Sequence, residues 1–213
     1  MCGRYAITLP KEAMRQLFGA PAPDDCRPRV NISPQSTNTV IRLADGGREA
    51  IQIKWGLRPL WWKADKTKAE PFNAQAEGVA SKPFFRDAFK HRRCAVPATA
   101  FYEWDRKTVP KTPYQFTVDG GAPFCFAGLW ERWKSTEGEE VQTYTIITTE
   151  PNKLVTQWHN RMPVILDRDH VDAWLTESDS ALCQAMLAAF PAHRMDAVAV
   201  SPKMNSSRYE GPV

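Results

Sequence analysis

The feature that most constrains the fold is a series of short apolar and β-branched runs, each bounded by proline, glycine, asparagine or aspartate. The alternation of Ile51, Ile53 and Trp55 is typical of a half-buried β-strand. The turn sequences DGG at 45–47 and DGGAP at 119–123 predict hairpins. From these patterns we expect strands over residues 39–44, 49–55, 93–103, 113–118, 123–129, 141–149, 162–166 and 195–200.

Helical patterns are fewer, and they do not alternate regularly with the strands. We expect Pro83 at the first position of one helix and Ser178 or Ser180 as the N-cap of another. Irregular alternation argues against repeated βαβ units, so we predict an α+β fold. Its core would be a largely antiparallel, curled or barrel-like sheet, flanked by short helices within a single domain of residues 1–213. The helical candidates cover residues 10–18, 83–91, 168–175 and 178–190.

Composition narrows the class of protein. The 213 residues are 43% hydrophobic and include eight tryptophans, which is enough for a substantial core. No apolar run approaches about 18 residues, and the first thirty residues hold no continuous apolar stretch, so we expect neither a membrane span nor a secretory signal. The five scattered cysteines lack a C-x-x-C pair, which argues against a disulfide framework and a structural zinc site. We therefore expect a cytoplasmic monomer without metal or cofactor.

The positive charge is concentrated in one part of the chain. The net charge is +4, yet residues 54–93, the basic-aromatic segment, carry ten lysines and arginines against four acids. Tryptophans and phenylalanines are interleaved with these cations. A groove for single-stranded nucleic acid needs this combination, since cations attract phosphates and rings stack on bases. A solvated face above an aromatic core explains the same composition.

The N-terminus offers a reactive group. Small residues after Met1 permit its removal, which would leave Cys2 with a free α-amine and a thiol on adjacent carbons. An aldehyde that reacts with both groups closes a five-membered thiazolidine ring. Reactive cysteines need a particular environment, so the position of Cys2 alone does not distinguish this chemistry from coincidence.

Three further polar residues lie beside apolar strand ends. Asn73 lies in FNAQAEG, Glu103 lies between aromatics in FYEW, and His159 lies in WHNRMPVIL. Burial among aromatics would raise the pKa of Glu103 toward the range of an acid–base catalyst. Each residue alone fits a structural role: a turn, an ion pair or a satisfied histidine. Together with Cys2 they supply a nucleophile, an acid–base pair and an orienting amide. We also expect Asn31, in NISP, to form a polar turn.

Eight separated motifs carry a resemblance to a known family. In this order and from residue 2 to the C-terminus, the chain resembles the SOS-response-associated peptidase (SRAP) family, the abasic-site-processing proteins. The motifs are MCGRY, NISP, WGLRPLWW, PFNAQAEG, PFFRDAF, RRCAVPATAFYEW, WHNRMPVIL and AVSPKMNSSRYEGP.

The resemblance implies a covalent chemistry. Once Met1 is released, by autocatalysis or by an aminopeptidase, the α-amine of Cys2 would form a Schiff base with the aldehyde of an abasic site in single-stranded DNA. The thiol would then close a thiazolidine crosslink. Asn73 would orient Cys2 and the sugar, Glu103 would hold the amine and handle its proton, and His159 would assist opening of the sugar ring. The name peptidase would refer to the release of Met1.

The resemblance also implies a path for the DNA. A pair of tryptophans would act as a wedge that stacks on a base, and several cations would contact phosphates. Two departures from the family pattern stand out. Gln75 occupies a position where many relatives have arginine, and MNSSRYEGPV replaces a longer Asn/Gly-rich C-terminal turn. The implied DNA contacts are Arg4, Trp61, Trp62, Lys82, Arg86 and Arg161.

Two other functions remain open. A glutamine amidotransferase with an N-terminal nucleophile also begins Met-Cys-Gly, but its Arg-Gly-Pro-Asp stretch and Asn-Gly-Glu loop are missing here. A non-catalytic module that binds single-stranded DNA would need only the basic-aromatic segment.

Overall fold

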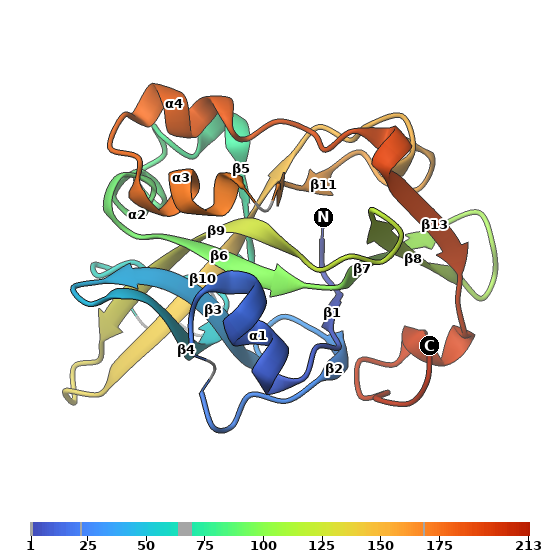
Figure 1. Cartoon of the computed structure of the whole chain (residues 1–213), viewed down its shortest axis with the longest axis horizontal. Helices are drawn as coiled ribbons and strands as arrows, with labels where there is room; N and C mark the ends of the chain where they lie inside the picture. Colours follow the sequence, from blue (N-terminus) through green and yellow to red (C-terminus); the bar gives the residue numbers. More distant parts are fainter. Residues whose placement is uncertain (1, 22, 64–69, 168) are drawn as a thin grey trace.

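The computed structural model describes residues 2–21, 23–63, 70–167 and 169–213. Figure 1 shows a strand-rich molecule with short helices at its periphery. The strands are β1 (Tyr5–Ile7), β2 (Arg29–Ile32), β3 (Thr37–Ala44), β4 (Gly47–Trp55), β5 (Asn73–Gln75), β6 (Arg93–Ala98), β7 (Ala100–Asp105), β8 (Thr112–Val118), β9 (Phe124–Lys134), β10 (Glu140–Thr149), β11 (Met162–Pro163), β12 (Ile165–Leu166) and β13 (Met195–Ala199). The helices are α1 (Lys11–Phe18), α2 (Arg86–His91), α3 (His170–Thr176) and α4 (Ser180–Ala185), with 3₁₀ turns η1 (Ala76–Gly78), η2 (Val155–Gln157), η3 (Ala192–Arg194) and η4 (Pro202–Asn205).

Five strands close into a barrel. The order β10-β4-β3-β6-β9 returns to β10, and every pair is antiparallel except β10 with β4. Strands β6 and β10 are buried on both faces along most of their length, so they read as apolar runs rather than as alternating ones. Helices α2, α3 and α4 gather on one side of the barrel (Figure 1). This architecture confirms the predicted α+β fold with a barrel-like, largely antiparallel core.

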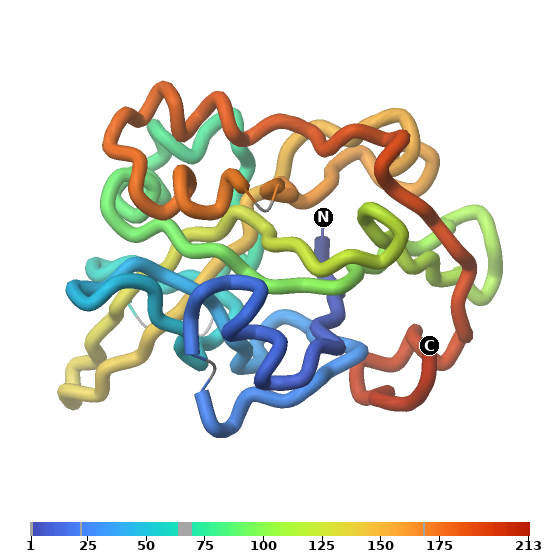
Figure 2. The backbone as a smooth tube through the Cα atoms, in the orientation of Figure 1, coloured from blue at the N-terminus to red at the C-terminus, as the bar shows by residue number. Residues whose placement is uncertain are grey.

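A second sheet holds the N-terminal segment inside the molecule. Its order is β13-β8-β7-β1-β2, so β1 lies between two partners. Tyr5 pairs with Phe101 on one side and with Ile32 on the other. Figure 2 shows the chain starting near the middle of the molecule. Chain ends usually fray into solvent, but here β1 is paired on both sides, and Cys2, three residues before it, is fully buried.

Several predicted elements are corrected. The run 93–103 is two strands in different sheets, and the break falls at Thr99, whose N–H donates to the Ala6 carbonyl at 2.8 Å. The 119–123 turn joins β8 to β9 across the two sheets, so it is not a hairpin, whereas the turn at 45–47 does join the antiparallel pair β3–β4.

The predicted helix ends also shift. Helix α2 begins at Arg86, three residues after the predicted Pro83. The N-cap of α4 is Asp179, whose side chain accepts from the Ala181 N–H at 2.7 Å, in place of the predicted Ser178 or Ser180. Asn31 lies in β2 rather than in a turn.

Three strands were missed by the sequence patterns, namely β1, β2 and β5. Each has only three or four residues, too few to display an alternating pattern. In the part of the chain that the structure describes, no helix has the length and apolar character needed to cross a bilayer.

Candidate active site around Cys2

Asn73 anchors the N-terminal segment from the barrel side. Its strand, β5, runs parallel to β10, with Asn73 opposite Ile146. The Asn73 Nδ2 donates to the Cys2 carbonyl at 2.8 Å, so the backbone of Cys2 has a defined position. The other amide atom, Asn73 Oδ1, is buried and accepts no hydrogen bond from the described residues. A hydrogen-bond acceptor is therefore available beside Cys2.

Glu103 supplies an acid–base group on the opposite side, from β7. Its side chain is buried, and burial raises its pKa to about 7, partly offset by the positive charge of Arg106. The Glu103 carboxyl can therefore exchange a proton near neutral pH. Burial, together with the negative charge of Glu103, raises the pKa of the Cys2 thiol far above its ordinary value. The thiol is thus protonated at neutral pH, and the nearby carboxylate does not favour its ionisation.

His159 follows the 3₁₀ turn η2, and its backbone N–H donates to the Val155 carbonyl at 3.0 Å. Its Nδ1 accepts from the Arg161 N–H at 3.0 Å, so the neutral ring carries its proton on Nε2. Burial, helped by the positive charge of Arg106, lowers the pKa of His159 to about 4. At neutral pH the ring is therefore uncharged and able to donate from Nε2.

Glu103 and His159 meet in one cavity of about 540 Å³ beside the N-terminus. The cavity collects side chains from the N-terminal segment, from β7 and the loop after it, from the turn before β11, and from the C-terminal segment. Its charged groups are three cations and one acid. The lining residues are Gly3, Arg4, Glu103, Trp104, Arg106, Lys111, His159 and Asn205.

Arg4 is fixed at this cavity by the C-terminal segment 201–213. Its Nη1 donates to Asn31 Oδ1 at 2.6 Å and to the Met204 carbonyl at 3.2 Å. The buried Asn31 in turn donates from Nδ2 to the carbonyls of Ser206 and Tyr209. One amide thus joins the cavity wall to the C-terminal segment.

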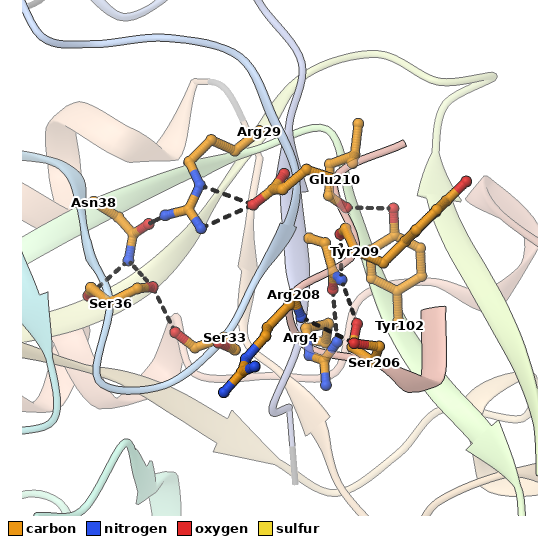
Figure 3. Close-up of polar contacts among 12 residues, drawn as sticks. Arg4, Arg29, Ser33, Ser36, Asn38, Tyr102, Ser206, Arg208, Tyr209 and Glu210 are labelled. Atoms are coloured by element: carbon orange, nitrogen blue, oxygen red, sulfur yellow. Dashed lines mark hydrogen bonds and ion pairs between the residues drawn. The ribbon is translucent and has the colours of Figure 1, made fainter. Parts of the chain in front are cut away.

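A second residue of β2 holds the same segment. Arg29 binds Glu210, with 3.0 Å between Nη2 and Oε1, and Figure 3 shows this pair beside Arg4 and Tyr209. The sequence predicted a local turn at Asn31. Its amide instead donates to carbonyls that lie 175 and 178 residues further along the chain, and such distant partners cannot be read from the sequence.

The other predicted DNA contacts lie elsewhere and are unevenly exposed. Arg161 binds both carboxylate oxygens of Glu77, at 2.7 and 2.9 Å, and donates to the Thr148 carbonyl. Lys82 donates to the exposed Gln75 at 3.3 Å. Arg86 is an exposed cation at the start of α2, 3.7 Å from Asp87.

The two adjacent tryptophans differ sharply. Trp61 is 57% exposed, while Trp62 is 8% exposed and packs against Trp133, with 5.6 Å between ring centroids. The guanidinium of Arg58 lies over the Trp62 ring at 4.9 Å. Only Trp61 therefore presents a ring to solvent.

Much of the charge in the basic-aromatic segment is already paired. Lys54 and Arg58 both bind Glu70, and Arg92 binds the buried Glu131 at 2.9 Å. These three cations form ion pairs within the protein, so their charge is not available to bind a phosphate. Sequence reasoning missed the cations that line the cavity, Arg106 and Lys111, although both follow closely after the Glu103 motif.

Comparisons with known proteins identify the family of the chain. The family model described as SOS response associated peptidase (SRAP) matches residues 1–207. The chain is 35% identical to Abasic site processing protein YoaM of Bacillus subtilis, over 98% of this chain and 94% of that protein. It is 30% identical to Abasic site processing protein HMCES of Rattus norvegicus, over 100% of this chain and 74% of that protein.

Solved structures share the fold. A protein from Bacteroides thetaiotaomicron matches with a TM-score of 0.88 and 26% identity, over 95% of this chain and 93% of that one. A Bordetella bronchiseptica protein matches with a TM-score of 0.83 and 30% identity, over 94% of this chain and 100% of that one.

Fold and site together define a class: strand-rich α+β proteins in which a buried cysteine near the start of the chain lies beside a cavity lined by a carboxyl and an imidazole. Within that class, the chain belongs to the SOS-response-associated peptidase (SRAP) family.

Proposed function

We propose that this protein processes abasic sites in single-stranded DNA by capturing their aldehyde on Cys2, after Met1 has been released. The observation that carries the proposal is the position of Cys2, bound by Asn73 and next to the cavity that Glu103 and His159 line. The printed names of the relatives, abasic site processing proteins, support the substrate. Met1 lies outside the described residues, so its release is an expectation from the sequence.

The high thiol pKa favours attack by the amine first. The Glu103 carboxylate accepts a proton from the α-ammonium of Cys2, and the amine adds to the aldehyde carbon. Protonated Glu103 then returns the proton to the departing hydroxyl, and water leaves as the Schiff base forms. The thiol adds to the C=N carbon, and its proton passes to the nitrogen. Aldehyde and aminothiol thus give a thiazolidine and one water molecule.

Asn73 and His159 have distinct roles in this proposal. Asn73 Nδ2 holds the Cys2 carbonyl, and Oδ1 accepts a hydrogen bond from the freed amine. His159 is neutral with its proton on Nε2, so it donates to the ring oxygen of the closed sugar and assists opening to the aldehyde. The peptidase step is hydrolysis of the Met1–Cys2 amide, and we assign its acid–base group to Glu103, whose charge acts on Cys2.

A denaturing gel with an oligonucleotide that contains one abasic site tests the proposal. Wild-type protein should give a heat-stable shifted band, and Cys2→Ala should give none. Cys2→Ser keeps the amine but lacks the thiol, so its product should survive only after borohydride reduction of the Schiff base. Glutamine hydrolysis with no covalent band would instead indicate an amidotransferase, and a shift on native gels alone would indicate a binding module.

Intact mass tests the release of Met1. The intact mass of purified wild-type protein should be lower than that of the full sequence by one methionine residue. If Glu103→Gln retains Met1 in the same host, the release is autocatalytic. If both proteins lack Met1, a separate aminopeptidase removes it.

A further inference from the structure

We propose that Arg106 and Lys111, at the two ends of the β7–β8 hairpin loop, form a binding subsite for one phosphodiester of the strand that enters the Cys2 cavity. This inference rests on the proposed function for the identity of the strand. It assigns the phosphate contact to cations outside the basic-aromatic segment.

The register of the hairpin brings the two cations together. Asp105, the last residue of β7, pairs with Thr112, the first residue of β8. Arg106 directly follows Asp105, and Lys111 directly precedes Thr112. The two cations are therefore attached to neighbouring strand ends. Both are exposed, and both line the 540 Å³ cavity with Glu103 and His159.

The loop between the two cations is held by its own hydrogen bonds. The Asp105 carboxylate accepts from the Lys107 N–H at 2.8 Å. The Thr108 hydroxyl accepts from the Thr112 N–H at 2.8 Å and lies 3.0 Å from the Thr112 hydroxyl. These bonds use no atom of the Arg106 or Lys111 side chains. The subsite is therefore preorganised, and binding a phosphate there costs little ordering of the backbone.

The other cations near the site are already engaged. Arg4 binds Asn31 and the Met204 carbonyl, and Arg161 binds Glu77 through both carboxylate oxygens. Within the described residues, no acidic side chain forms a salt bridge with Arg106 or Lys111. A phosphodiester carries one negative charge on two oxygens, which matches the planar fork of an arginine and the point charge of a lysine.

Salt dependence of binding tests the subsite without the covalent step. The probe is a single-stranded oligonucleotide with one tetrahydrofuran residue, which mimics the abasic sugar but has no aldehyde. For the double variant Arg106→Gln/Lys111→Gln, the slope of log affinity against log salt should fall by about 0.7, the value for one lost phosphate contact. Lys107→Gln is the control within the same hairpin: it removes one positive charge, against two in the double variant, from a side chain that does not line the cavity.

Equal slopes for the double variant and the control would overturn the subsite, and so would failure of the wild type to bind this probe. An unchanged melting temperature of the double variant excludes loss of fold as the cause.

Single methylphosphonate substitutions then locate the phosphate. Neutralising one phosphate beside the tetrahydrofuran residue should weaken wild-type binding, and the same substitution should have no further effect on the double variant. If the double variant loses as much as the wild type at every position, the subsite is wrong. Absence of a covalent band with the true aldehyde, while these binding results hold, overturns the proposed function alone.

Discussion

The Cys2 cavity and the basic-aromatic segment both combine charge with aromatic rings, yet the fold uses them differently. In the cavity, Glu103 and His159 are desolvated, and their pKa values move to about 7 and about 4. In the segment, Lys54 and Arg58 are paired with Glu70, whose pKa is lowered by these contacts despite the opposing effect of burial. Burial thus shifts the protonation equilibria of the two cavity residues, whereas the ion pairs of the segment keep Glu70 ionised.

The comparison teaches that local composition is a poor guide to free charge. The segment carries a surplus of six positive charges, more than the net +4 of the whole chain, but Arg92 binds Glu131 and Arg93 binds backbone carbonyls. The cavity has a smaller count of cations, and two of them, Arg106 and Lys111, line it and form no salt bridge within the described residues.

Replacing Glu103 should produce the largest effect. It tests whether the buried carboxyl of the Cys2 cavity takes part in the chemistry. Glu103→Gln keeps the shape but removes the proton exchange, so the rate of crosslinking should fall by about 10²–10⁴-fold. Affinity for the tetrahydrofuran oligonucleotide should stay unchanged. Single-turnover gels and fluorescence anisotropy measure the two quantities. Equal losses in both would make Glu103 a structural residue.

The pH dependence of the crosslinking rate, measured for the wild type and for Glu103→Gln, tests whether Glu103 is the base. Because the carboxylate is the base, the wild-type rate should rise with pH through about 7, and Glu103→Gln should lose that inflection. Stability should change in the opposite sense. The folded pKa of Glu103 is above its unfolded value, so its contribution to stability is present below about 4.5 and is lost as pH rises toward 7. An inflection at 7 that persists in Glu103→Gln would move the base elsewhere.

Separate alanine variants of the two tryptophans test the aromatic side of the comparison. Trp62→Ala removes a buried ring that packs on Trp133, so it should lower the free energy of unfolding by about 3–5 kcal/mol. Trp61→Ala should leave stability nearly unchanged and weaken single-strand binding by about 1–3 kcal/mol, the value of one lost base stack. Urea titration and anisotropy separate the two. Unchanged affinity of Trp61→Ala would remove the wedge from the proposal.

The smallest expected effect concerns Lys82, which crosses over Gly78. A Cβ at residue 78 would lie 2.7 Å from Lys82 Cε, so Gly78→Ala must displace the lysine side chain from Gln75. If the ammonium contacts DNA, Gly78→Ala and Lys82→Gln should each weaken binding at low salt by about 1 kcal/mol or less. The double variant should lose no more than Lys82→Gln alone, since both act on one group. Additive losses would contradict this link.

Most of the barrel could be predicted from the sequence, but few of its boundaries near the site could. Strands such as β4 and β10 have seven or more residues of apolar pattern, and a pattern of that length identifies a strand without knowledge of its partners. The strands that carry Cys2, Asn31 and Asn73 into place are too short for such a signal, and pairing with β7, β1 and β10, respectively, makes them strands. The hairpin predicted at 119–123 failed for the same reason, since a turn sequence does not say which sheet the next strand joins.

The residues of the candidate site divide in the same way. The reactive residue types are visible in the sequence: a cysteine at position 2, and a carboxyl, an imidazole and an amide at strand ends in motifs that identify the family. The tertiary structure sets their protonation states, because burial, charge and hydrogen bonding depend on neighbours that are distant in the chain. It also decided that Trp61 is exposed while Trp62 is core, that Arg4 is held by Asn31, and that Arg106 and Lys111 line the cavity. Residue chemistry is local, but desolvation and pairing are properties of the packed molecule.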